Sequence, residues 1–250
     1  MVMDYSLNYL GGAQSAFLDE ADALSEFGHE VSIVAPGTPD SAWANRWEGS
    51  IFGVKPRGTI PVVDLPYIPN SRQLRNSLAD FFERQNISVV HVHSEFGLAH
   101  AAAEAAHSLG IPVVFTVHTF FWEARLPKPL DRAAAPALRR GLLGLTGRRI
   151  TGEDVTGSPL AAAEVDATLR GATLTLAKLA DTVVSPSAHQ ARRLREAVCP
   201  MPPKTLKPLS GCGWCPTARS TQKRPVARLS RWNRRCELCG LGEWFKKNES

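Results

Sequence analysis

The sequence predicts an α/β fold with a doubly wound parallel sheet, and residues 87–124 give the clearest evidence. An apolar, β-branched run over 87–92 precedes an Ala- and Leu-rich segment over 97–109, and a second apolar run follows over 113–117. Such a compact strand–helix–strand unit implies two parallel strands joined by a right-handed crossover. The same order of elements recurs before and after this stretch, which favours a sheet with helices on both faces.

The first part of the chain repeats this order with a short opening strand. Val2 and Met3 end that strand, a turn runs through Gly11 and Gly12, and a helix then ends at Gly28. Its inward residues recur at helical spacing: Phe17, Leu18, Ala21, Leu24 and Phe27. A second strand is expected over 31–36. Because the first strand of such a sheet is usually central, its shortness indicates that the true start lies upstream or that the gene is a fragment.

The remaining elements complete one Rossmann-like domain, which we assign to residues 1–203. Residues 37–70 are interpreted as loops around a strand, and residues 71–85 as an amphipathic helix with Ser71 as its N-cap. Three further elements are expected: a helix over 160–180, a strand over 180–187 and a helix over 189–198. Their order is that of an open α/β sheet.

A proline-broken segment before residue 150 alternates arginines with leucines and has two interpretations. Over residues 131–149 it could contact an anionic membrane surface as a peripheral segment. The alternative is a solvated crossover helix.

Composition points to an ordinary globular chain whose last part differs from the rest. The hydrophobic fraction is 44%, and no apolar run reaches the roughly 20 residues that span a bilayer. The N-terminus lacks the basic and apolar regions of a secretory signal, so we expect a cytoplasmic protein, peripheral at most to the inner face of the membrane. Residues 1–200 hold 18 basic against 21 acidic residues, whereas residues 201–250 hold 11 against 3.

Candidate functional residues follow the strands, where ligands of open α/β sheets bind. His91, His93 and Glu95 end one strand, and His118 and Thr119 end the next. The pair His91 and His93 could form half of a metal site, but no carboxylate or third histidine stands at matching spacing, so we predict no metal. His118 could be a structural histidine or a functional one.

Two other features of the sequence say less about chemistry. Gly11 and Gly12 before a helix would let backbone amides approach an anion, or would only form a tight turn. Ser187 and His189 lack the G-x-S-x-G spacing of a nucleophile elbow, which argues against a hydrolase.

Five segments, in this order over about residues 4–200, resemble glycosyltransferase family 4: YLGGAQ, GHEVSIVAP, VVHVHSEFGL, IPVVFTVHTFFWE and ADTVVSPSAHQARRL. The likeness is to the N-terminal, acceptor-binding half of the two-domain GT-B fold. The combination HSEFGL and HTFFWE looks most like members that glycosylate lipids such as diacylglycerols.

The resemblance implies transfer of a hexose from a nucleotide-sugar to a lipid or small-molecule acceptor, with the nucleotide-sugar as co-substrate and no cofactor. Gly11 and Gly12 match the family's glycine turn, which faces the donor diphosphate and the acceptor. His118 matches the family's histidine at the reaction centre. His93, Glu95 and Thr119 would lie on the acceptor side.

The resemblance ends near Pro203, where a family member should continue into a donor-binding domain with a Glu-x7-Glu motif. We therefore expect that the donor half is missing and that the chain is truncated and inactive on its own. Residues 204–250 are interpreted as a disordered or frame-shifted tail. The alternative is a zinc-ribbon-like, nucleic-acid-binding module built on Cys212, Cys215, Cys236 and Cys239. For the protein as a whole, nucleic acid is not an expected partner.

Overall fold

The computed structural model describes residues 1–8, 11–37, 47, 50–60, 64–119, 126–150 and 163–198. The chain divides into two units, Met1–Val198 and Cys199–Ser250, and the second unit lies outside the described residues. The predictions for the tail, including those for the two C-x2-C pairs of cysteines, therefore lie outside the described residues. Among the described residues, no helix combines the length and the apolar character needed to cross a membrane.

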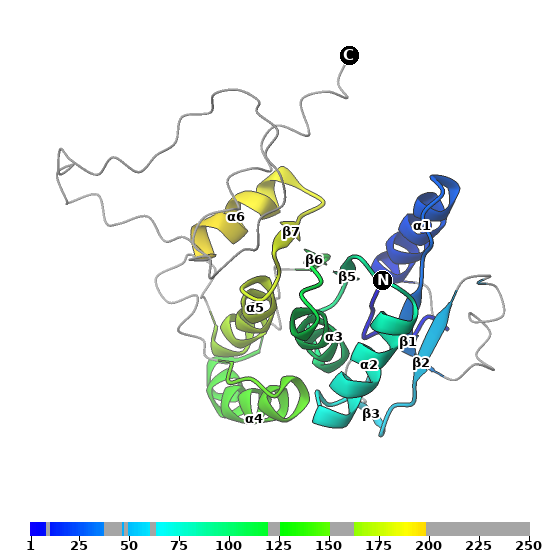
Figure 1. Cartoon of the computed structure of the whole chain (residues 1–250). Helices are drawn as coiled ribbons and strands as arrows, with labels where there is room; N and C mark the ends of the chain where they lie inside the picture. The colour runs from blue at the N-terminus through cyan, green and yellow to red at the C-terminus, as the bar shows by residue number, and fades with distance from the viewer. Residues whose placement is uncertain are drawn as a thin grey trace, which may run out of the picture. The chain divides into compact units, whose positions relative to one another are not determined.

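Among the described residues of the first unit, five short strands form the parallel sheet, as can be followed in Figure 1. They are β1 (Ile33–Pro36), β2 (Ile51–Val54), β5 (Val90–Val92), β6 (Val113–Thr116) and β7 (Thr182–Val184). β1 pairs with β2, while β6 lies between β5 and β7. Val2 connects the two groups because it forms parallel bridges to Val34 of β1 and to Val92 of β5. The order across the sheet is thus β2, β1, Val2, β5, β6, β7, and the predicted fold class is confirmed.

This strand order creates a reversal point beside Val2. From Val2 the chain moves outward through β1 and β2, returns to β5 on the other side of Val2, and then moves outward again through β6 and β7. In doubly wound sheets ligands bind beyond the carboxyl ends of the strands at such a reversal. The segments that follow Val2 and β5 are therefore the expected place for a binding site.

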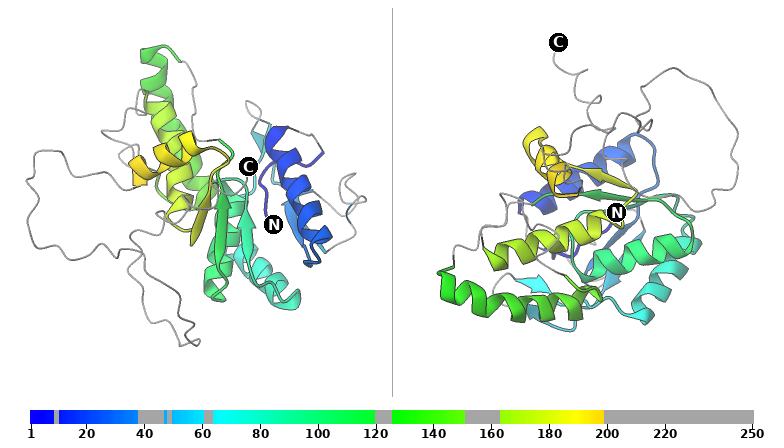
Figure 2. Two further views of the ribbon diagram at one scale, coloured as in Figure 1. Left: turned by 90° about the horizontal axis from the view of Figure 1, so that it is seen from above. Right: turned by 90° about the vertical axis from the view of Figure 1, so that its left-hand side faces the viewer.

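Six helices flank the described sheet: α1 (Gly12–Glu26), α2 (Arg72–Arg84), α3 (Gly97–Ser108), α4 (Lys128–Thr146), α5 (Glu164–Ala177) and α6 (Ala188–Val198). α2, α3, α4 and α5 pack in sequence against one another, and α1 lies on the other side of the sheet (Figure 2). A short antiparallel pair, β3 (Thr59–Ile60) and β4 (Leu65–Pro66), lies within the connection from β2 to α2.

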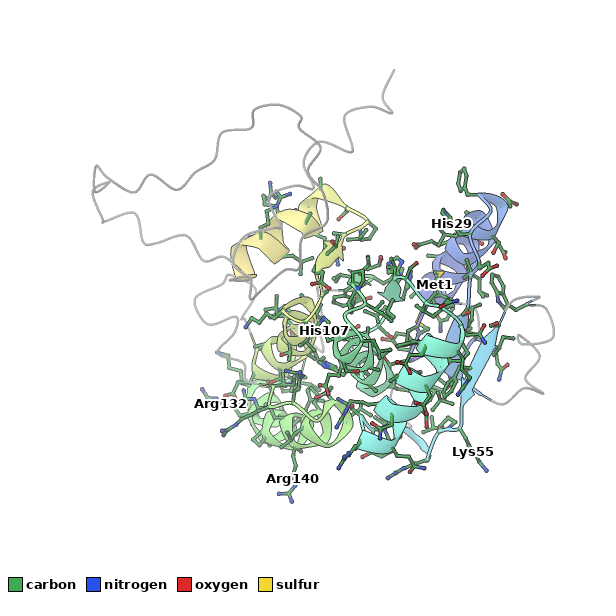
Figure 3. The ribbon with its side chains drawn as sticks, in the orientation of Figure 1. Met1, His29, Lys55, His107, Arg132 and Arg140 are labelled. Carbon is green, nitrogen blue, oxygen red and sulfur yellow. The ribbon has the colours of Figure 1, made fainter. Side chains whose placement is uncertain are left out.

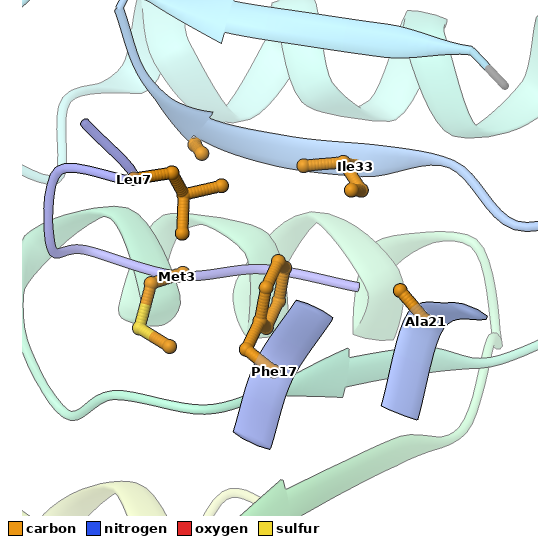
Figure 4. Packing of buried hydrophobic residues seen from close by; sticks show 6 residues of the cluster. Met3, Leu7, Phe17, Ala21 and Ile33 are labelled. Atoms are coloured by element: carbon orange, nitrogen blue, oxygen red, sulfur yellow. The ribbon is translucent and has the colours of Figure 1, made fainter. Parts of the chain in front are cut away.

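Apolar side chains fill both sides of the sheet. Between α1 and the sheet, the core consists of Met3, Leu7, Phe17, Ala21, Ile33 and Ala35 (Figure 4). On the opposite side, a second cluster joins Leu65, Phe96, Leu142, Leu145, Ile150 and Ala172. Full burial of one large apolar side chain contributes about 1.5–3 kcal/mol, so these two clusters hold the helices in place beside the strand ends.

Gly97 allows the start of α3 to approach two other segments. A Cβ at this position would stand 2.6 Å from the carbonyl oxygen of Leu145 and closer still to that of Ile68. Both neighbours are backbone atoms, which cannot move aside as a flexible side chain can. Gly97 therefore fixes how closely α3 packs against the end of α4.

α2 agrees with its prediction, and two other sequence expectations need correction. Ser71 caps α2 as expected, because its Oγ accepts a hydrogen bond from the Leu74 amide at 3.2 Å. The strand expected over 87–92 begins only at Val90, since the Ile87 amide donates to the Phe82 carbonyl at the end of α2 and Val89 is 47% exposed. Phe27, expected to face inward, caps the end of α1 and is 82% exposed.

Two longer segments also differ from the sequence expectations. The described part of residues 37–70 forms three short strands where a single one was expected. The segment expected to be broken by prolines forms one continuous helix, α4, with Pro136 inside it on an exposed surface. α4 buries Ala135, Leu142 and Leu145, so one side of this crossover helix belongs to the core.

Candidate active site

A pocket of about 350 Å³ lies at the reversal point of the sheet. Its lining comes from the segments after Val2 and β5, the first turn of α1 and the end of β6: Tyr5, Gly12, Ala13, Gln14, His93, Glu95, His118 and Thr119. Five of the six residues predicted for the site are in this lining. The sixth, Gly11, is the N-cap residue of α1 and directly precedes Gly12 of the lining.

The two helices that begin at this pocket differ in how their first amides are satisfied. Among the described residues, α1 has no side-chain cap at Gly11, and Gly12, Ala13 and Gln14 of its first turn line the pocket. The start of a helix carries a partial positive charge and free N–H donors, which favour an anion such as a phosphate. A side chain at position 11 would also meet the Gln14 Oε1 atom, 2.9 Å from the added Cβ.

The start of α3 is instead occupied by the buried carboxylate of Asp4. Asp4 accepts hydrogen bonds from the backbone amides of Phe96 (3.1 Å), Leu98 (2.7 Å) and Ala99 (3.3 Å) and from the Ser94 hydroxyl (2.7 Å). Burial raises the pKa of the Asp4 carboxyl, and these hydrogen bonds oppose that rise. Asp4 thus ties the segment after Val2 to the start of α3, whereas no described side chain caps the start of α1 at the pocket.

Three histidines from β5 and the end of β6 lie together beside the pocket. His93 Nδ1 is 3.0 Å from His118 Nε2, and the two rings stack with centroids 5.3 Å apart. His91 Nδ1 lies 3.0 Å from Glu20 Oε1, and His91 Nε2 lies 2.8 Å from Thr116 Oγ1. The cluster therefore connects a carboxylate on α1 with a histidine in the pocket.

Burial favours the neutral form of two of these rings, His93 and His118. His93 is 1% exposed, and the edge of its ring meets Phe17 of α1 at 5.0 Å between centroids. Burial lowers the pKa of His93 far below its usual range, and the neighbouring rings of His91 and His118 add to the effect. Burial also lowers the pKa of His118, while the Glu20 carboxylate opposes that change.

Glu95 supplies a second unusual titratable group. It is 6% exposed, and burial, followed by the charge of Asp4, raises the pKa of its carboxyl from 4.5 to about 8. The Thr173 hydroxyl donates a hydrogen bond to Glu95 Oε1 at 3.4 Å. Near neutral pH the carboxyl is mostly protonated, so Glu95 can donate a hydrogen bond into the pocket as well as accept one.

Several site residues were missed because their partners are distant in the sequence. Asp4, Tyr5, Gln14 and Glu20 all stand at or beside the site, and the only local signal was the position of the first two directly after a strand. Glu20 supplies the carboxylate that His91 and His93 lacked in the sequence. Among the described residues, Glu20, His91 and His93 each offer one nitrogen or oxygen atom, and these atoms lie within 4.8 Å of one another.

Ser187 and His189 are not in the pocket lining. Ser187 Oγ accepts a hydrogen bond from the Gln190 amide at 3.1 Å at the start of α6. His189 Nδ1 lies 3.1 Å from Arg192 NH2 on the same helix.

Comparison with known proteins identifies the family. The sequence model of Glycosyltransferase Family 4 matches residues 10–151. The chain belongs to glycosyltransferase family 4. The match includes Gly11, Gly12, the β5–α3–β6 unit and the strand ends that carry the predicted site, so the resemblance based on these segments is confirmed.

Two curated family relatives match about half of the chain. Phosphatidyl-myo-inositol mannosyltransferase of Mycolicibacterium smegmatis is 30% identical over 127 residues, which are 48% of this chain and 30% of the relative. A human subunit of phosphatidylinositol N-acetylglucosaminyltransferase is 29% identical over 133 residues, which are 48% of this chain and 25% of the relative. The matches thus span less than a third of either relative's length. Among solved structures, MurG of Acinetobacter baumannii covers 49% of this chain at 21% identity, with a TM-score of 0.35 and 35% of its own chain matched.

Proposed function

We propose that the described unit is the acceptor-binding half of a glycosyltransferase that transfers a hexose from a nucleotide-sugar to a lipid or small-molecule acceptor. Family membership supports the reaction class. The observation that carries the proposal is the pocket at the sheet reversal, which is lined both by the first turn of α1 and by His118, Glu95 and Thr119. The names of both curated relatives refer to phosphatidylinositol, which favours a lipid acceptor with a polyhydroxylated headgroup.

Each predicted residue has chemistry that suits its proposed role. Amides at Gly11 and Gly12 would stabilise phosphate charge at the start of α1. The imidazole of His118 would hold a hydroxyl group at the reaction centre, and His93, Glu95 and Thr119 would stand on the acceptor side. A protonated Glu95 suits a neutral polyol, because it can donate to one hydroxyl oxygen and accept from another hydroxyl. The nucleotide-sugar is the co-substrate, and the proposal includes no further cofactor.

We also propose that α4 contacts the membrane as a peripheral element at its inner face. The exposed residues of this helix include two leucines, Leu130 at 57% and Leu143 at 45%, and two arginines, Arg132 and Arg140. Arg132 and Arg140 extend away from the body of the unit (Figure 3). A surface of this kind suits anionic headgroups and the acyl boundary. Such contact would bring the pocket to a lipid acceptor.

Titration of the ¹⁵N-labelled full chain with inositol 1-phosphate, followed by NMR, tests the acceptor assignment. The proposal predicts saturable shifts of the amide signals of Glu95, Thr119 and the first turn of α1. His118→Ala should weaken binding at least several-fold, whereas His29→Ala, at an exposed position after α1, should not. Glycerol 1-phosphate in a parallel titration separates an inositol-specific pocket from one that accepts any polyol phosphate. Absence of shifts at the pocket with both compounds would refute the acceptor assignment.

A further inference from the structure

Glu20, His93 and His118 form a continuous chain of polar contacts that ends in the pocket. Glu20 is 38% exposed on α1, and its Oε2 atom lies 3.8 Å from His93 Nε2. On the other side of the same ring, His93 Nδ1 lies 3.0 Å from His118 Nε2. His93 itself is 1% exposed, so its two nitrogens have these neighbours in place of water.

The positions of the ring protons follow from the chemistry of the partners. An ionised carboxylate only accepts hydrogen bonds, and a neutral imidazole has one N–H donor and one acceptor nitrogen. In a neutral His91 ring, Nδ1–H donates to Glu20 at 3.0 Å, and Nε2 accepts from the Thr116 hydroxyl at 2.8 Å. For the neutral ring, this arrangement of protons satisfies both contacts.

The same reasoning assigns the protons of the other two rings. His93 Nε2 has no hydrogen-bond partner among the described residues and faces the Glu20 carboxylate, which favours a proton on this nitrogen. His93 Nδ1 is then the acceptor, and the 3.0 Å contact requires that His118 Nε2 donates to it. His118 Nδ1 consequently has no proton. Such assignments rest on the hydrogen-bond network as a whole, and here each contact is compatible with the next.

We propose that Glu20 and His93 are positioning residues that hold His118 as its Nε2–H tautomer, so that Nδ1 can accept a hydrogen bond from a substrate hydroxyl. The role of the hydroxyl rests on the proposed function, whereas the tautomer does not. His93 then acts on the acceptor through His118. Glu20 acts from outside the pocket. Carboxylates in other enzymes likewise orient an imidazole and select its tautomer.

Long-range ¹H–¹⁵N spectra of the histidine rings in the full chain test this proposal without any substrate. In the wild-type protein, His118 should show a protonated Nε2 and an unprotonated Nδ1. Glu20→Gln replaces the carboxylate with a group that can also donate to His93 Nε2, so it should raise the population of the Nδ1–H tautomer of His118. Glu26→Gln, an exposed position on the same helix, is the matched control and should leave the spectrum of His118 unchanged.

Three results would overturn the proposal. The first is a wild-type His118 protonated on Nδ1, and the second is a tautomer population that Glu20→Gln does not change. The third is a bound metal ion: if EDTA treatment of the purified chain shifts the ring signals of His91 and His93, a metal and not a hydrogen-bond chain holds this cluster.

An activity measurement separates this proposal from the proposed function. Where sugar transfer is measurable, Glu20→Gln should lower kcat about tenfold or more with little change in KM, because a correctly oriented acid–base group contributes about 10²–10⁴-fold. If the ring spectra agree with the proposal but no sugar transfer or headgroup binding occurs, the proposed function fails and the positioning role stands. If transfer occurs and Glu20→Gln leaves kcat unchanged, the positioning role fails alone.

Discussion

Glu95 gives the protein a pH-dependent stability that Glu95→Gln should remove. Burial and the charge of Asp4 raise the pKa of this carboxyl from 4.5 in the unfolded chain to about 8 in the folded one. Between these values the folded state holds more protons than the unfolded state, so stability falls as pH rises. The contribution is fully present below about 4.5 and is lost as pH increases through about 8.

The size of this effect follows from the pKa shift. Each unit corresponds to about 1.4 kcal/mol, so the wild-type protein should lose on the order of 4 kcal/mol across this window relative to Glu95→Gln. Glutamine has nearly the same shape as the protonated acid and cannot ionise. Asp4 is present in both proteins, and its interaction with the Glu95 charge is part of the difference that the comparison measures.

Urea denaturation followed by circular dichroism at a series of pH values measures the difference. Wild type and Glu95→Gln should be similarly stable near pH 5, and the variant should become progressively more stable than wild type toward pH 8, the range set by the two pKa values. Glu83→Gln, at an exposed position on α2, should follow wild type at every pH. Parallel stability curves for wild type and Glu95→Gln would refute the reasoning, because they would mean that Glu95 has the same pKa in both states.

Three further predictions concern the fold and the membrane surface. Gly97→Ala should lower the free energy of unfolding by about 1–3 kcal/mol, because the added methyl group overpacks against two carbonyl oxygens. Gly141→Ala is the control and should not destabilise the protein, since the space around its Cβ is open. Equal denaturation midpoints for the two variants would contradict this prediction. Asp4→Ala should cost about 3 kcal/mol or more, because three buried amides lose their acceptor, and Asp4→Asn should cost less; hydrogen exchange at the start of α3 provides the check. Arg132→Glu combined with Arg140→Glu should weaken binding to anionic vesicles about tenfold or more, since each basic residue contributes about 1 kcal/mol. Sedimentation with anionic and with neutral vesicles measures this binding, and unchanged binding would rule out α4 as the contact.

The elements that could be predicted from the sequence are those determined by local patterns. α2 is set by a capping serine and an amphipathic period, and Leu78, Phe81 and Phe82 are buried as their spacing indicates. The periodicity of α1 extended to Phe27 in the sequence, but the helix ends one residue earlier and the Phe27 side chain is exposed. β5 is shorter than its apolar run because pairing with β6 begins only at Val90.

The candidate site was accessible to sequence reasoning only in part. Strand ends and a glycine turn marked six residues, and the sheet order brings five of them into one pocket lining. The bond between Asp4 and Ser94 joins positions 90 residues apart, and no local spacing predicts it. The contact of Glu20 with the histidines likewise depends on how α1 crosses the sheet. The protonation of Glu95 depends on its burial, which becomes known only with the fold.

Sugar transfer by a chimera tests whether this unit is the acceptor-binding half of a glycosyltransferase. Residues 1–198 would replace the region of the phosphatidyl-myo-inositol mannosyltransferase that matches this chain, and transfer of labelled mannose to phosphatidylinositol vesicles would be measured. We expect the chimera to transfer mannose, His118→Ala to lower its kcat at least about tenfold, and His29→Ala to leave turnover unchanged. A folded chimera that transfers no mannose, or one whose turnover survives His118→Ala, would refute the proposed function.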